Sequence, residues 1–189
     1  MKRTRPPFRA DHVGSLLRPQ RLLDAREEAA AGRLDTAELR TIEDDAIREV
    51  VRRQEESGLQ SATDGELRRT SWHMDFIYQL DGITHEAGHI AIRFVNDEGE
   101  IEFTPAALHV EGRLGVSKTI FGKDFEFLRE TVRTAVPKLT IPSPSMVHYR
   151  GGKAAIDPSV YPELDGFWTD LVAAYREQVR RLGELGCTY

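Results

Sequence analysis

Two carboxylates flank a glycine in the stretch Ser61–Glu66, which reads Ser-Ala-Thr-Asp-Gly-Glu. We interpret this stretch as a short buried strand that ends in polar groups, with Asp64 and Glu66 at its mouth. In parallel α/β folds the carboxyl ends of the strands carry the chemistry. Gly65 would let the backbone turn sharply or approach a ligand closely. A solvated Asp-Gly turn is the alternative that these six residues leave open.

Two other predicted strands also end in small polar residues. Phe8–Ser15 ends in Val13-Gly14-Ser15, whose backbone N–H groups could bind an anion or a carboxylate. A simple turn is the alternative there. Lys138–Ile141 ends in the turn-forming sequence Pro-Ser-Pro-Ser at residues 142–145. The sequence therefore predicts three strand ends that carry polar groups.

Helices separate these strands, and each would pack one face against a sheet. The clearest covers residues 36–57, where Asp35 and Glu38 form a capping signal and apolar residues recur every three or four positions. Further helices are expected over Gln20–Ala31, Asp124–Ala135 and Tyr161–Leu185. Short loops between such helices and strands are typical of parallel sheets.

The segment 84–120 changes character and predicts a β-hairpin. Apolar residues alternate on both sides of a turn at residues 96–99. In a barrel this hairpin would be an insertion on one βα loop. Three histidines lie in the segment, and their spacing matches no metal pattern, so we interpret them as scattered surface residues: His85, His89 and His109.

The bulk composition excludes several classes of protein. The 189 residues are 40% apolar and carry a net charge of −5. No basic patch alternates with aromatic residues, which argues against nucleic acid as a partner. No apolar run approaches the roughly 20 residues of a membrane span, and the basic start has no apolar core of a signal peptide. The one cysteine, Cys187, cannot form an internal disulfide, and this fits a reducing cytoplasm.

The order of predicted elements resembles roughly half of a (β/α)₈ barrel, which typically needs about 250 residues. We therefore expect one domain over residues 1–189 that is the N-terminal part of such a barrel, and we expect the chain to be truncated. An incomplete barrel would expose sheet edges and an apolar interior, so a homo-oligomer is also expected.

Taken in order, the three strand ends resemble the cobalamin-independent methionine synthase family, and in particular its short members that match the catalytic barrel. The stretches that carry the resemblance are residues 11–19, residues 63–66 and residues 140–145. The resemblance implies a UROD/MetE-like (β/α)₈ barrel. It also implies a 5-methyltetrahydropteroyltriglutamate–homocysteine S-methyltransferase-like activity. In such an enzyme a methyl group moves from a methyltetrahydrofolate-type donor to a thiol such as that of homocysteine, which zinc holds as the thiolate.

The resemblance also assigns roles to residues of this chain. Val13, Gly14 and Ser15 match the segment that holds the amino-acid substrate through backbone N–H groups and a hydroxyl. Glu66 matches the carboxylate that takes the substrate ammonium. Backbone donors suit a carboxylate, and a fixed carboxylate suits an ammonium. The wall of the pocket would include four further residues: His12, Asp64, Ser143 and Ser145.

The family's zinc ligands have no match here, and Cys187 is not one of them. We therefore expect the ligands to lie beyond Tyr189, and we expect this chain alone to be inactive. Two alternatives stay open. One is a sister enzyme of the same superfamily, a decarboxylase or a thiol transferase, for which Arg18, Arg68 and Arg69 give weak support as carboxylate-binding groups. The other is a non-catalytic half-barrel that binds an amino acid or a partner.

Overall fold

The computed structural model describes residues 5–86, 92–96, 99–103 and 107–189. They divide into two compact units, which are described separately. The first unit takes its residues from Met1–Trp72, Phe121–Thr140 and Leu182–Tyr189, and the second from His73–Ile120 and Ile141–Arg181. His89 lies outside the described residues. In the described part of the chain, no helix combines the length and the apolar character that crossing a membrane requires.

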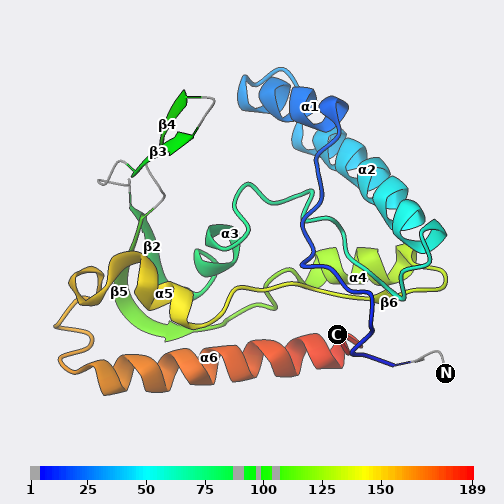
Figure 1. The fold of residues 1–189 in the computed structure, drawn as a ribbon. Helices are drawn as coiled ribbons and strands as arrows, with labels where there is room; N and C mark the ends of the chain where they lie inside the picture. Colours follow the sequence, from blue (N-terminus) through cyan, green and yellow to red (C-terminus); the bar gives the residue numbers. More distant parts are fainter. Residues whose placement is uncertain (1–4, 87–91, 97–98, 104–106) are drawn as a thin grey trace. The chain divides into compact units, whose positions relative to one another are not determined.

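The first unit places three helices around one parallel pair of strands (Figure 1). The helices are α1 (Gln20–Ala30), α2 (Thr36–Glu56) and α4 (Gly122–Thr131), and the strands are β1 (Ser61–Ala62) and β6 (Val136–Pro137). Ser61 pairs with Val136 and Ala62 with Pro137. The predicted capping box starts α2, because Asp35 accepts from the N–H of Glu38 at 2.8 Å and the Glu38 side chain accepts in return at 3.0 Å.

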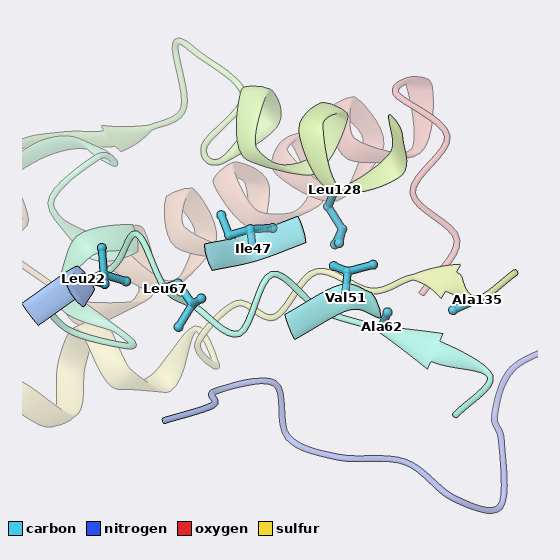
Figure 2. Packing of buried hydrophobic residues seen from close by; sticks show 7 residues of the cluster. All are labelled: Leu22, Ile47, Val51, Ala62, Leu67, Leu128 and Ala135. Carbon is cyan, nitrogen blue, oxygen red and sulfur yellow. The ribbon is translucent and has the colours of Figure 1, made fainter. Parts of the chain in front are cut away.

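The core of the first unit lies where α2 contacts β1 and α4 (Figure 2). Ile47 and Val51 are fully buried on one face of α2, as the helical spacing predicts. Figure 2 shows them beside Leu128 of α4 and Ala62 of β1. Burying an aliphatic side chain of this size contributes about 1.5–3 kcal/mol. This packing fixes α2 and α4 on the strand pair whose ends carry the polar residues.

The second unit contains two antiparallel pairs of strands together with helices. Strand β2 (Asp81–Glu86) pairs with β5 (Ala107–Gly115), and β3 (Ile92–Asn96) pairs with β4 (Gly99–Phe103). The helices are α3 (Met74–Ile77), α5 (Ser145–Gly151), the 3₁₀ helix η1 (Lys153–Ala155) and α6 (Leu164–Glu184), of which the residues up to Arg181 belong to this unit. The Gln178 side chain of α6 ties the backbone of Ile120 through two hydrogen bonds of 2.9 and 3.0 Å.

Mixed helices and strands confirm the predicted α/β class, and the pairing of β3 with β4 confirms the hairpin. The described residues contain one parallel pair, β1 with β6, so the complete (β/α)₈ barrel stays a prediction. The single domain over residues 1–189 stays a prediction as well.

Three strand predictions are corrected. Strand β1 ends at Ala62 instead of Glu66, because the Gln54 side chain takes both the N–H and the C=O of Thr63, at 3.0 and 2.9 Å. The third predicted strand lies at Val136–Pro137, two residues before its predicted start. Residues 8–15 form no strand, and their contacts to the Glu66 loop are single hydrogen bonds, such as the 2.7 Å bond from the Thr63 hydroxyl to the Gly14 carbonyl.

Two predicted helices and one predicted loop are also corrected. Helix α4 ends at Thr131 instead of Ala135, because Glu55 accepts hydrogen bonds from three consecutive backbone N–H groups at residues 133–135. The loop expected after Met146 contains α5 and η1. Helix α6 begins at Leu164, three residues after the predicted start.

Candidate functional site

Glu66 lies at the end of a turn that its neighbours hold rigidly. The residue is 4% exposed and has φ of 55°, a left-handed conformation that is rare outside glycine. The Asp64 side chain accepts a hydrogen bond from the Glu66 N–H at 2.9 Å, and Thr63 Oγ1 accepts from the Gly65 N–H at 3.2 Å. These side-chain acceptors stabilise the turn after β1. The sequence Thr-Asp-Gly-Glu therefore forms a hydrogen-bonded turn that fixes the backbone of Glu66.

Thr140, at the third predicted strand end, contacts both this turn and the first predicted strand end. Its hydroxyl donates a hydrogen bond of 2.6 Å to Glu66 Oε1. Its methyl group lies against Gly14, where an added Cβ would come within 2.6 Å of Thr140 Cγ2. Gly14 also has φ of 141°, which side chains rarely adopt. The structure thus brings together one residue from each of the three motifs: Gly14, Glu66 and Thr140.

Sequence reasoning missed Thr140 as a site residue, although it opens the third motif. The signal that could have found it is its place at the polar end of a predicted strand.

The other predicted site residues divide into two groups. Val13 and Ser15 lie exposed on either side of Gly14, and Val13 is 85% exposed. His12 is half-buried; its carbonyl accepts from Lys138 Nζ at 2.6 Å, and its ring nitrogens have no hydrogen-bond partner among the described residues. Ser143 and Ser145 belong to the second unit, where their hydroxyl oxygens lie 2.9 Å apart. The structure therefore does not place these two serines relative to Glu66.

Asp64 is a buried carboxylate that supports the turn. Burial raises its pKa, and the positive charge of Arg69 opposes that rise. Its Oδ1 accepts from the Glu66 N–H. The contact indicates that Asp64 shapes the loop that carries Glu66, whatever its part in the pocket wall.

Arg69 is the nearest buried cation to the Glu66 carboxylate. Its Nη1 lies 3.5 Å from Glu66 Oε1, and its guanidinium lies 4.3 Å from the ring centroid of Phe121. The residue is 3% exposed. Nη1 and Nη2 make no hydrogen bond in the part of the chain that the structure describes.

The other two arginines, Arg18 and Arg68, form hydrogen bonds or ion pairs with other groups of the protein. Arg68 forms ion pairs with Asp44 of α2 and, at 3.5 Å, with Asp124 of α4. Arg18 donates to the backbone carbonyls of Arg69 and Glu66, at 2.6 and 3.3 Å. These contacts weaken the support that the three arginines gave to a carboxylate-binding decarboxylase, because two of them hold the fold together.

A second polar network connects the segment before Gly14 to Lys138, the residue after β6, and to Tyr189. Lys138 Nζ lies 3.0 Å from both carboxylate oxygens of Asp11, and the Tyr189 hydroxyl also donates to Asp11. Burial pushes the pKa of Asp11 up, but the hydrogen bonds from Tyr189 and Lys138 outweigh it and hold this pKa well below its ordinary value. The network fixes the position of residues 11–12 beside the site.

The described residues contain no group of three His, Cys, Asp or Glu side chains that could hold a metal ion. His85 is exposed on β2, and His109 is half-buried on β5 with its Nδ1 3.4 Å from Glu111. Cys187 is half-buried, and burial raises the pKa of its thiol, which disfavours the nucleophilic thiolate.

A groove of about 900 Å³ lies between α2 and α4, together with the segment that follows α4. Its lining is dominated by charged side chains of a solvated helix face, including Arg48, Glu49, Arg52 and Glu55. None of the predicted site residues lines it. The size of this groove therefore does not make it the functional site.

The site is therefore a buried carboxylate, Glu66, held on a turn that follows one strand of a parallel pair in an α/β unit. No protein-family model matches the chain. It is 38% identical over 188 residues to YxjH and 37% identical over 190 residues to YxjG, two uncharacterized proteins of Bacillus subtilis strain 168. The chain spans about half the length of these curated relatives, 48% of each.

Two solved structures extend the comparison. The first is from Listeria monocytogenes, and its proposed identity is a vitamin-B12-independent methionine synthase. It matches 98% of this chain and 51% of its own, with 37% identity and a TM-score of 0.80. The second is a B12-independent methionine synthase from Shewanella sp. W3-18-1 in complex with selenomethionine. It matches 82% of this chain and 42% of its own, with 22% identity and a TM-score of 0.58. This second match supports the fold alone. The match to the Listeria monocytogenes structure confirms the predicted resemblance to the cobalamin-independent methionine synthases.

Proposed function

We propose that this chain is the amino-acid-binding part of a methionine-synthase-like methyltransferase. In this proposal Glu66 takes the ammonium of an amino-acid thiol such as homocysteine. The backbone N–H groups and hydroxyl of Gly14 and Ser15 take its carboxylate. The complete protein is a (β/α)₈ barrel that moves a methyl group from a methyltetrahydrofolate-type donor to the thiol.

The observation that supports this proposal is that both contacts to the Glu66 carboxylate are made to the same oxygen. Both of its partners, Thr140 and Arg69, contact Oε1. Within the described residues no hydrogen bond or ion pair reaches Oε2. A carboxylate that is fixed through one oxygen can offer the other to an ammonium as a charge-assisted hydrogen bond. The close approach of Thr140 to Gly14 keeps the second half of the proposed site beside the first.

Zinc, which the resemblance implies, would supply an activated thiolate for the attack on the methyl group. The described residues provide no ligand set for it. We therefore propose that the zinc ligands come from sequence outside this chain. What this chain contributes is the binding and orientation of the amino-acid end of the substrate.

Isothermal titration of the chain with L-homocysteine and with L-methionine tests the proposal. We expect both to bind and Glu66→Gln to weaken binding by at least about tenfold, the loss of one charge-assisted hydrogen bond. Glu43→Gln is the matched control, because Glu43 is a buried carboxylate on α2 whose partners are arginines. A homocysteine analogue without the amino group should bind the wild type and Glu66→Gln equally.

Two outcomes would contradict the proposal. One is a wild-type chain that binds neither amino acid. The other is equal loss of affinity in Glu66→Gln and Glu43→Gln, which would indicate a general effect of removing a buried charge.

A further inference from the structure

We propose that Arg69 is a positioning residue: its guanidinium, together with the Thr140 hydroxyl, holds Oε1 of Glu66 and so directs Oε2 toward a substrate ammonium. The inference rests on the proposed function for the identity of the ligand. It rests on the contacts of Arg69 for the mechanism.

The first support is the burial of both partners. Arg69 and Glu66 are 3% and 4% exposed, and the distance between Nη1 and Oε1 is 3.5 Å. Solvent screens such a pair far less than a surface pair, so the attraction between the guanidinium and Oε1 restrains the side chain of Glu66.

The second support is the way in which Arg69 itself is held. Its guanidinium stacks over the ring of Phe121, and its own backbone is fixed on both sides. The Arg69 N–H donates to the Glu66 carbonyl at 3.0 Å, and its carbonyl accepts from Arg18 at 2.6 Å and from Arg26 at 3.1 Å. Arg69 therefore cannot move away from Glu66 without breaking the turn.

The third support is what Arg69 does not contact. Its Nη1 and Nη2 make no hydrogen bond to the described residues. The guanidinium therefore acts on Glu66 by charge at short range instead of by a bidentate hydrogen-bonded fork. This separates Arg69 from an arginine that binds a carboxylate through a hydrogen-bonded fork.

The test records the Glu66 carboxyl resonance at pH 7 by NMR of the chain labelled with ¹³C at the glutamate carboxyls. The resonance is assigned by its loss in Glu66→Gln. In Arg69→Gln we expect this resonance to shift, because the guanidinium beside Oε1 is removed, and in Arg69→Lys we expect a smaller shift. Arg68→Gln is the matched control, because Arg68 is equally enclosed but pairs with Asp44 and Asp124.

The control is expected to lose stability without moving the Glu66 resonance. An unchanged resonance in Arg69→Gln, or an equal shift in Arg68→Gln, would overturn the inference. If Arg69→Gln does not fold, Arg69→Lys decides: its different side chain must move the resonance, and no shift overturns the inference.

Binding of L-methionine gives a second readout. For Arg69→Gln we expect roughly tenfold weaker binding at pH 7, with part of the affinity retained in Arg69→Lys. An affinity of Arg69→Gln equal to that of the wild type would count against the inference. If the wild type binds no amino acid, the proposed function fails, while the NMR shift of the Glu66 carboxyl still decides the role of Arg69.

Discussion

Thr140 donates a hydrogen bond of 2.6 Å to the Glu66 carboxylate, across 74 residues of sequence. This one contact links the end of β1 to the end of β6. It lies within the first unit, so the geometry does not depend on how the two units are placed. A hydroxyl that selects one carboxylate oxygen also determines which oxygen remains for a ligand.

Replacing the hydroxyl of Thr140 should release the Glu66 side chain. We expect Thr140→Val to weaken L-methionine binding several-fold and to lower the free energy of unfolding by about 1–3 kcal/mol, because a buried hydrogen bond to a charged group is lost. Thr140→Ser keeps the hydroxyl and should retain most of the affinity. Calorimetric titration and urea unfolding measure the two effects. Equal affinity in the valine and serine variants would contradict this account.

Gly14→Ala should destabilise the chain through a steric conflict. The new Cβ would lie 2.6 Å from Thr140 Cγ2, in a backbone conformation with φ of 141°. We expect a loss of about 1–3 kcal/mol in the free energy of unfolding. The serine at position 140 in a Gly14→Ala/Thr140→Ser double variant lacks that methyl group, so part of the loss should be recovered.

Gly32→Ala is the control for backbone strain alone, since φ is 71° there and an added Cβ meets nothing within 4 Å. Strictly additive losses in the double variant would show that the contact with Thr140 is unimportant.

The Asp11 network should make stability depend on pH in the acid range. The hydrogen bonds from Tyr189 and Lys138 lower the pKa of Asp11 in the folded state, so its contribution is present above the unfolded value of about 3.9. It is lost as the pH falls from about 5 toward the folded pKa. We expect Asp11→Asn to be less stable than the wild type at pH 7 and the difference to shrink below pH 4.

Thermal unfolding from pH 7 to pH 2 measures this dependence. Asp24→Asn is the comparison, because Asp24 accepts only a hydrogen bond from Gln20 among the contacts in the described residues. A stability difference between the wild type and Asp11→Asn that stays constant across this range would refute the assignment.

Zinc should neither be retained by this chain nor enable it to turn over. We expect less than one tenth of a zinc ion per chain by mass spectrometry after exposure to zinc and desalting, since the described residues contain no ligand group. Methionine formation from homocysteine and methyltetrahydrofolate should be absent with or without added zinc. About one tightly held zinc per chain would place ligands in this sequence and refute that part of the proposal.

Local signals in the sequence predicted much of the first unit. The capping box at Asp35 and the apolar spacing around Ile47 and Val51 are properties of neighbouring residues, and α2 forms as they indicate. The turn chemistry of Asp64 and Gly65 is equally local, and the turn forms there, although β1 ends earlier than predicted, at Ala62.

The remaining features depend on partners distant in sequence. Glu55, which accepts the N–H groups just after α4, lies 78 to 80 residues from them in the sequence. Thr140 lies 74 residues from Glu66 in the sequence. Nothing near Thr140 reveals its partner, and nothing near Arg69 distinguishes it from Arg68. Only the fold shows that one of these adjacent arginines faces the carboxylate of the site and the other faces α2.

The contacts of Gln54 affect whether a strand of another chain can pair with this one. Its side-chain amide occupies both main-chain groups of Thr63, in the manner of a neighbouring strand. A foreign strand that paired there would have to displace an amide already bonded through both its nitrogen and its oxygen. Helix α2 thereby seals the backbone just before Asp64 and Glu66 against edge-to-edge aggregation, without adding a strand of its own.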